Sequence, residues 1–277
     1  MGSTPTRIRF GLCHNRRLPA MSKLINLARS SAVFLMGRES KPRKILFGLA
    51  AGCRINVSPA ERLSYLFGTA ESHLQKAIRR YVAKGDNVYD IGANIGYVSL
   101  SLACRVGSAG RVIAFEPVPK NLELLRGNIA ENALTNVKVM DAAASDVCGE
   151  TTIRIAHNLA TASLVWHRNE PSAVEFSVNT VVIDELVKTG DLPPPSFVKI
   201  DVEGAEAFVV RGMLRTIAAA KPVLFIECSD AGREITWPLL RNLGYRCQSA
   251  ITLRWIENLA EYRHSDFLWL PPERVAA

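Results

Sequence analysis

Four acidic residues each follow a short apolar, β-rich run of the chain. Asp90 stands in "NVYDIGANIGYVSL", residues 87–100, Glu116 ends "RVIAFE", Asp201 ends "FVKID" and Glu227 ends "VLFIE". If these runs are parallel strands, their carboxyl ends meet at one edge of a sheet, where open α/β sheets bind ligands. Carboxylates there suit a positively charged ligand and general-base chemistry.

The loop after the first run indicates which ligand is bound. Gly92 and Gly96 allow a sharp turn and a close backbone approach, and the helix expected from Tyr97 offers its amide groups. A nicotinamide dinucleotide needs G-x-G-x-x-G, but Asn94 replaces the middle glycine and the spacing fails. Asp90 would repel a pyrophosphate and attract the sulfonium and ammonium of S-adenosylmethionine by several kcal/mol before desolvation, at an effective dielectric of about 20. An NAD-dependent oxidoreductase therefore ranks last.

Glu116 follows Asp90 by 26 residues and is placed to accept hydrogen bonds from both ribose hydroxyls. That role fits either cofactor, so Glu116 is weaker evidence than Asp90. The structural alternatives are a loop-capping aspartate at Asp90 and a helix N-terminal charge at Glu116. The adenine is expected near the end of the third strand, where Asp141 or Asp146 could accept its amino group. The choice between them stays open, and a plain surface acid is an equal alternative.

Alternation of short apolar runs with helical stretches predicts an α/β, Rossmann-like fold with a mostly parallel sheet and helices on both faces. The expected strands are 87–92, 111–117, 136–144, 196–204 and 221–230, and the expected helices 97–107, 119–134 and 204–220. Polar–apolar alternation in 150–156 and 175–186 predicts half-exposed antiparallel strands, and 245–256 and 266–272 are two further strand candidates.

Charge divides the chain into segments. Residues 1–87 hold 16 Lys and Arg against four Asp and Glu, and residues 88–277 hold 18 against 22. We expect a basic, flexible segment at 1–45, a lead-in at 46–87 whose helix covers the cofactor site, and a Rossmann-like domain at 88–277. The basic segment is either a solvated tail or a peripheral contact with an anionic surface. Nucleic acid is disfavoured, because no aromatics are interleaved with the charges.

The remaining composition, 48% hydrophobic and 22% charged, is typical of a globular protein. No apolar run approaches the roughly 18–20 residues that span a bilayer, and no secretory signal is evident. The six cysteines form no C-x-x-C pair, which favours free thiols in a reducing compartment. A cytoplasmic protein is expected, and its oligomeric state is left open.

Several motifs together resemble the FkbM family of S-adenosylmethionine-dependent methyltransferases. They are "GLAAGCRINV", "YLFGTAESHLQKAIRRYVAKGD", "YDIGANIGYVSL", "VIAFEP", "AASD" with Gly149, "VKIDVEGAE" and "FIECSD", within about residues 46–230. The resemblance implies a seven-stranded-type methyltransferase fold and O-methylation of a hydroxyl on a sugar, polyketide or similar small metabolite. It implies a cofactor site formed by Asp90, Gly92, Ala93, Asn94, Gly96 and Glu116.

A hydroxyl acceptor must lose a proton as it attacks, so a general base or a metal is expected near the methyl group. Asp201 is the candidate base or acceptor anchor, with Glu227 and Glu203 shaping the pocket. Glu203 points the same way as Asp201 if the strand continues that far. Mg²⁺ held by Asp201 and Glu227 is a less favoured alternative. Lys199 either pairs with one of these acids or faces solvent on an edge strand.

Other polar residues are weaker candidates. His73 on the lead-in helix, and His157 and His167 in the polar middle segment, are more simply surface histidines than bases. Trp166 could be a platform for a sugar ring, although core packing is its default role. Two rival functions stay open: an RNA methyltransferase that uses the basic segment, and a non-catalytic scaffold that keeps the cofactor fold.

Overall fold

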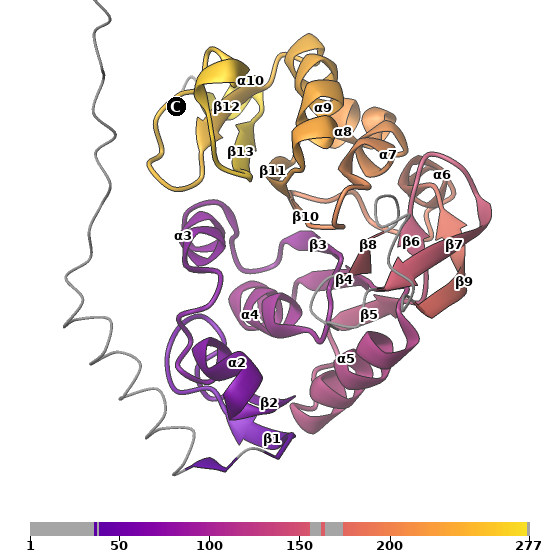
Figure 1. Cartoon of the computed structure of the whole chain (residues 1–277). Coiled ribbons are helices and arrows are strands. Elements are labelled where there is room, and N and C mark those ends of the chain that lie inside the picture. Colours follow the sequence, from indigo (N-terminus) through magenta and orange to yellow (C-terminus); the bar gives the residue numbers. More distant parts are fainter. Residues whose placement is uncertain (1–35, 38, 156–161, 164–173, 276–277) are drawn as a thin grey trace, which may run out of the picture.

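The computed structural model describes residues 36–37, 39–155, 162–163 and 174–275 (Figure 1). Its centre is a seven-stranded sheet in the order β12-β13-β11-β10-β3-β4-β5. The strands span Asn87–Ile91 (β3), Arg111–Phe115 (β4), Val137–Met140 (β5), Phe197–Ile200 (β10), Val223–Glu227 (β11), Arg246–Ser249 (β12) and Asp266–Leu270 (β13). β13 runs antiparallel to both of its neighbours, whereas β5, β4, β3, β10 and β11 are mutually parallel. The expected mostly parallel α/β sheet is confirmed.

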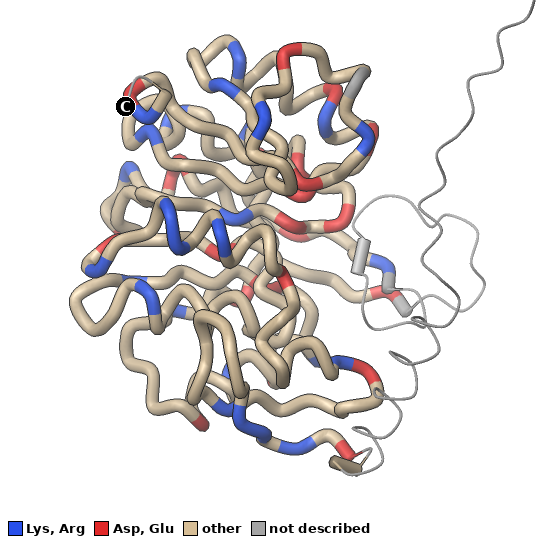
Figure 2. The backbone as a smooth tube through the Cα atoms, turned by 90° about the vertical axis from the view of Figure 1, so that its left-hand side faces the viewer, with Lys and Arg blue, Asp and Glu red and all other residues tan. Residues whose placement is uncertain are grey.

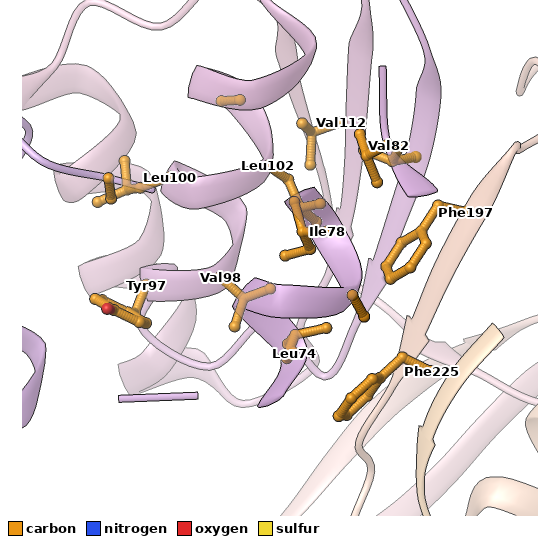
Figure 3. Close-up of a cluster of buried hydrophobic side chains, with 14 of the residues drawn as sticks. Leu74, Ile78, Val82, Tyr97, Val98, Leu100, Leu102, Val112, Phe197 and Phe225 are labelled. Atoms are coloured by element: carbon orange, nitrogen blue, oxygen red, sulfur yellow. The ribbon is translucent and has the colours of Figure 1, made fainter. Parts of the chain in front are cut away.

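Helices cover both faces of this sheet. One face carries α3 (Ser72–Tyr81), α4 (Tyr97–Val106) and α5 (Pro119–Glu131), and the other carries α6 (Ile183–Lys188), α7 (Glu206–Arg211), α8 (Leu214–Ala220) and α9 (Asp230–Asn242). Side chains alternate along each strand, so Val88 and Phe197 face the first group while Tyr89 and Val198 face the second. Figure 3 shows the first face, where Leu74 and Ile78 of α3 lie beside Val98 and Leu102 of α4.

A second sheet forms beside the first, in the order β6-β9-β7-β8. It contains Ala143–Ala144 (β6), Gly149–Ile155 (β7), Ala162–Ser163 (β8) and Val174–Val181 (β9), with β7 and β9 antiparallel as expected. The expected strand 175–186 is wrong at its end, because β9 stops at Val181 and the chain enters α6 at Ile183. The expected strand 136–144 is wrong in one respect: β5 ends at Met140, and β6 leaves the main sheet to pair with β9.

The expected helix 204–220 is two helices, α7 and α8, separated at Gly212. A Cβ at Gly212 would lie 1.9 Å from the carbonyl oxygen of Ser145, so the backbone passes here where a side chain would not fit. The amide of Asp184 also donates to the Gly212 carbonyl, 2.9 Å away. The C-terminal end of α7 is therefore packed closely against two other segments of the chain.

The lead-in packs on the sheet domain through side-chain amides. It contains β1 (Lys41–Lys44), β2 (Arg54–Val57) and α2 (Pro59–Leu66), followed by α3. β1 pairs with β2 although it lies within the segment expected to be flexible, so ordered structure begins before residue 46. Asn128 of α5 accepts from the Asn56 amide at 2.7 Å and donates to the Ile95 carbonyl at 2.8 Å. One buried side chain thus ties the lead-in to the loop after β3.

The C-terminal part of the chain completes the fold. A 3₁₀ turn at Leu259–Glu261 (η1) precedes β13, and α10 (Pro272–Val275) follows it. Within the described ranges, no helix is both long and apolar enough to cross a membrane.

Candidate active site

The strand register places five residues in one row across the carboxyl edge of the sheet. The last register pairs are Phe115 with Ile91, Ile91 with Ile200, and Ile200 with Ile226. The next residues along each strand are therefore Glu116, Gly92, Asp201 and Glu227, and Glu227 pairs with Asp266 of β13. The strand order reverses between β3 and β10, which is where ligands bind in open α/β sheets.

A cavity opens at this row. Its walls come from four parts of the fold: the lead-in, the loops after β3 and β4, the segment from Ala142 to Ile153, and the loops after β10 and β11. The lining residues are Arg62, Tyr65, Glu71, Ile91, Gly92, Asn94, Phe115, Glu116, Pro117, Val118, Asn121, Ala142, Ala143, Ala144, Ile153, Asp201, Val202, Glu203 and Glu227. They include five carboxylates and one guanidinium among the described residues. Acidic positions also group on one side of the backbone in Figure 2.

The loop after β3 turns as its glycines predict. Gly92 has φ +80°, and a Cβ there would lie 1.8 Å from the Asp201 carbonyl oxygen, so only glycine fits between the two loops. The amides of Gly92 and Ala93 both donate to the Phe115 carbonyl, at 3.0 and 2.9 Å. Asn94, at φ +52°, lines the cavity, whereas Ala93 is buried. Gly96 stands at the start of α4 and packs against Leu125 of α5. Gly92 and Asn94 are thus exposed to a ligand, and Ala93 and Gly96 shape the turn.

The structure does not place Asp90 on the cavity wall. It is fully buried one residue before the last position of β3, and Ser99 of α4 donates to its Oδ2 at 2.6 Å. The Lys199 ammonium lies 3.3 Å from Asp90 Oδ1 and 3.4 Å from Asp201 Oδ2, and it donates to the Gly92 carbonyl at 2.6 Å. The direct attraction to a cofactor expected of Asp90 is therefore not what the geometry shows. Asp90 instead holds the lysine that supports the loop.

The structure selects one of the two alternatives that the sequence left open for Lys199, which is buried and paired with acids. Burial alone lowers the pKa of a lysine, but the charges of Asp201 and Asp90 outweigh that effect, and the pKa of Lys199 is raised. The ammonium therefore carries its charge at every working pH, and it neutralises part of the charge of Asp201.

Glu116 lies where the sequence places it, at the tip of β4 on the cavity wall. It is buried, with 4% of its surface exposed. Its oxygens accept from the amide of Asn94 at 2.7 Å, the amide of Val118 at 3.0 Å and the side chain of Asn121 at 3.3 Å. Burial raises its pKa, and the hydrogen bonds from Val118 and Asn94 oppose the shift. Fixed in this way, the carboxylate presents its remaining lone pairs in one orientation.

The two acids expected near an adenine are not in the lining. Asp141 lies on the surface and pairs with Arg126 at 3.3 Å, while Asp146 accepts from the Ser145 hydroxyl at 3.4 Å. The wall beyond Glu116 is instead apolar, formed by Ala142, Ala143, Ala144 and Ile153. The chain turns away from β5 after Met140, which brings these small side chains, rather than Asp141, to the cavity.

Asp201, Glu203 and Glu227 come together as expected, although Glu203 does so for another reason. β10 ends at Ile200, so Glu203 does not lie on a continuing strand. It stands in the following loop with a left-handed backbone, φ +49°, and its side chain lines the cavity. Partial burial and then the charges of Asp201, Asp266, Glu71 and Glu203 raise the pKa of Glu227 to about 7. A second hollow, lined by Gly204, Glu206, Cys228, Ser229, Ala231 and Ser265, adjoins the first and shares these three carboxylates with it.

The lead-in contributes three cavity residues that the sequence did not identify. Arg62 donates to the Tyr65 hydroxyl at 3.0 Å, and the Tyr65 ring stacks on Tyr97 with centroids 4.4 Å apart. Glu71 has a left-handed backbone, φ 51°, just before α3, and its pKa is raised by partial burial. Non-glycine residues rarely adopt this conformation, but the type of residue gives no warning of it.

Glu206 is a further residue that the sequence did not single out within "VKIDVEGAE". It is buried, and its Oε1 accepts from the Gly204 amide at 2.6 Å while its Oε2 accepts from the Ser229 hydroxyl at 3.1 Å. It thereby joins the loop after β10 to the start of α9, and it positions the acids on either side.

The remaining candidates lie elsewhere. His73 does not line the cavity, although its Nδ1 is buried without a hydrogen-bond partner. His157, His167 and Trp166 are outside the described residues. In the described part of the chain, no three or more His, Cys, Asp or Glu side chains form a group able to hold a metal ion.

The fold and the site together indicate the class of protein to which the chain belongs. The chain is an α/β domain with a carboxylate at the tip of its second parallel strand and a cavity where the strand order reverses. A family model described as "Methyltransferase FkbM domain" matches residues 90–247, more than half of the chain. The chain belongs to the FkbM methyltransferase family, and the resemblance seen in its sequence motifs is confirmed. The fold is that of the class I methyltransferases.

The chain is also similar to individual proteins. Hexuronic acid methyltransferase AglP of Haloferax volcanii is 30% identical over 139 residues, which cover 50% of this chain and 54% of AglP. The match thus spans about half the length of that relative. Among solved structures, methyltransferase FkbM of Methylobacillus flagellatus KT is 17% identical, with a TM-score of 0.41 over 90% of this chain and 60% of that one. An S-adenosylmethionine-dependent O-methyltransferase of Thermotoga maritima is 14% identical, with a TM-score of 0.42 over 73% and 65%.

Proposed function

We propose that this protein transfers a methyl group from S-adenosylmethionine to a hydroxyl of a sugar or similar small metabolite. The observation that carries the proposal is the junction of two hollows at Asp201, Glu203 and Glu227, one of which has a wall suited to a nucleoside. A cofactor held in the cavity, which is the first hollow, and an acceptor held in the second hollow would meet at these carboxylates.

The residues of the first hollow fit the chemistry of S-adenosylmethionine. Glu116 offers a fixed carboxylate to vicinal ribose hydroxyls, and the apolar wall from Ala142 to Ala144 offers a surface to adenine. The other carboxylates favour the ammonium and sulfonium charges and disfavour a diphosphate. The preference that the sequence attributed to Asp90 thus comes, in this proposal, from the whole lining. When bound, the cofactor supplies a methyl group on a positively charged sulfur.

Two acids beside the junction would have different roles towards the acceptor. Asp201 lies 3.4 Å from the Lys199 ammonium, and its carboxyl oxygens are placed to accept hydrogen bonds from an acceptor molecule. No cation pairs with Glu227 among the described residues, and its pKa of about 7 is close to the value that suits a general base at neutral pH. We assign Asp201 to anchoring the acceptor, and Glu227 to taking up the hydroxyl proton on a carboxylate oxygen.

The charge of the site also bears on the acceptor. AglP is named for a hexuronic acid, which carries a carboxylate of its own. Here the lining carboxylates would repel that group, and Arg62, the one lining guanidinium in the described residues, already donates to Tyr65. A neutral hydroxyl-bearing ring is therefore the acceptor that this cavity favours.

Transfer of isotope-labelled methyl from S-adenosylmethionine to methyl glucoside, to methyl glucuronide and to total RNA tests the proposal. We expect label on the glucoside as an ether that survives mild base, with little on the glucuronide, and loss of transfer in Glu227→Gln. A base-labile ester on the glucuronide would contradict the neutral acceptor. Label confined to RNA would favour the rival function instead.

A further inference from the structure

Two cysteines lie in contact on the side of the fold where the lead-in meets α4. The Sγ atoms of Cys53 and Cys104 are 3.3 Å apart, although 51 positions separate them in the chain. Cys53 directly precedes β2, and Cys104 lies in the last turns of α4 with its side chain exposed. The sequence suggested six scattered free thiols, so this pairing is a product of the fold.

The backbone on both sides of the pair is held in place. The Cys53 carbonyl accepts from the Ile45 amide at 2.8 Å, and the Cys53 amide donates to Ala50 at 3.0 Å. Next to Cys104, the Arg105 guanidinium donates to the carbonyls of Val82 at 2.7 Å and Arg79 at 3.0 Å. The two sulfurs are therefore brought together by anchored segments, and a bond of about 2 Å between them needs only a small approach.

We propose that Cys53 and Cys104 form a reversible disulfide, and that this dithiol is a site of oxidative modification that fastens the lead-in to α4. The residues between the two cysteines include Arg62, Tyr65 and Glu71. The bond would therefore close a loop that contains the lead-in wall of the cavity at the candidate active site.

The chemistry is balanced with a peroxide as oxidant. The Cys53 thiolate attacks one peroxide oxygen, the O–O bond breaks, and a sulfenic acid and hydroxide form. The hydroxide takes up the proton that the Cys53 thiol released on ionisation and becomes water. The Cys104 sulfur then attacks the sulfenic sulfur, the S–O bond breaks, and water leaves with the thiol proton. Overall, two thiols and one hydrogen peroxide give one disulfide and two waters.

Local electrostatics favour Cys53 as the attacking thiol. Hydrogen bonding between the two sulfurs lowers the pKa of Cys53 to about 7, while the same contact raises the pKa of Cys104. A thiolate fraction at neutral pH makes a cysteine reactive towards peroxide. The exposed side chain of Cys104 gives a small oxidant access to the pair.

The test uses the full chain, treated with hydrogen peroxide and mapped by mass spectrometry without reduction. We expect a linked peptide pair containing Cys53 and Cys104, two hydrogens lighter than the separate peptides, that disappears with dithiothreitol. The unfolding temperature should rise by several degrees on oxidation, because the closed loop restricts the unfolded chain. Cys53→Ser and Cys104→Ser should each abolish both effects.

Cys148 provides the matched control, because its side chain is exposed and it contacts no other cysteine within the described residues. Cys148→Ser should leave the crosslink and the temperature shift unchanged. The inference is overturned if peroxide oxidises Cys148 while Cys53 and Cys104 remain separately alkylatable. It is equally overturned if the crosslink forms without a rise in unfolding temperature.

Discussion

At the scale of single residues, the site depends on how charges are distributed between a buried layer and an accessible one. Asp90 and Lys199 form the buried layer beneath the loop after β3, while Asp201, Glu203 and Glu227 form the accessible layer at the cavity. The lysine contacts both layers and donates to the Gly92 carbonyl, so it links the loop after β3 to Asp201.

Lys199→Met should therefore destabilise the protein strongly. The change leaves the Asp90 carboxylate buried without a cation, which typically costs about 3–5 kcal/mol. Unfolding in urea measures this directly. The double variant Lys199→Met with Asp90→Asn removes both charges and should recover a large part of the loss. A loss below about 1 kcal/mol in the single variant would mean that the ion pair does not support the loop.

Glu227 should give the reaction its pH dependence. A base must be ionised to accept a proton, so turnover should rise as pH increases through about 7, the pKa of Glu227. Glu227→Gln should lose this rise and about 10²–10⁴-fold of turnover, while cofactor binding persists. A pH–rate profile of both proteins is the measurement. An unchanged profile in the variant would remove Glu227 from the proposed mechanism.

The same residue predicts a stability effect that is independent of activity. Because its pKa is raised in the folded state, the unfolded chain releases the proton first, and the contribution of Glu227 to stability falls as pH rises from about 4.5 to about 7. Glu227→Gln should lack this loss. The difference in unfolding temperature between the variant and the wild type should therefore increase over that range and then level off.

At the scale of elements, the loops after β3 and β10 are fitted to each other at Gly92. Gly92→Ala should be severely destabilising, because its Cβ would overlap the Asp201 carbonyl in addition to the cost of φ +80°. Gly85→Ala is the matched control: its φ is +88°, yet its Cβ would meet nothing within 4 Å. We expect about 1–2 kcal/mol for the control in denaturant unfolding and clearly more for Gly92→Ala. Equal losses would show that the two loops are not in contact.

The elements also show how far sequence reasoning reaches. Strand ends with acids are visible in the sequence, because apolar runs closed by Asp, Glu, Gly or Pro mark where a buried strand stops. Glu116, Asp201 and Glu227 were found in this way, and all three line the cavity. Asp90 is the exception, because it lies inside β3 and alternation turns its side chain towards α4 rather than towards the cavity.

Other parts of the site have no local signal. Arg62, Tyr65 and Glu71 reach the cavity only because the lead-in folds over the sheet edge, a long-range contact that periodicity does not encode. The contact between Gly212 and Ser145 that separates α7 from α8 is also long-range, so a helical pattern alone predicted one helix. Residue types and spacing thus predicted the parallel sheet, whereas the closure of the cavity came from packing.

At the scale of the whole molecule, the central claim is that this cavity is built for a cationic nucleoside and not for a diphosphate. The carboxylates come from the lead-in and from three strand ends, so the preference is a property of the assembled fold. A ligand that binds only the folded state raises its unfolding temperature, which makes selectivity readable without a known acceptor.

Thermal unfolding with S-adenosylmethionine, S-adenosylhomocysteine and NAD, each at the same concentration, tests that claim most directly. We expect the first two to raise the unfolding temperature of the wild type and NAD to leave it unchanged. In Glu116→Gln, which keeps the size of the side chain, both shifts should shrink markedly. Stabilisation by NAD, or none by either sulfur ligand, would contradict the claim.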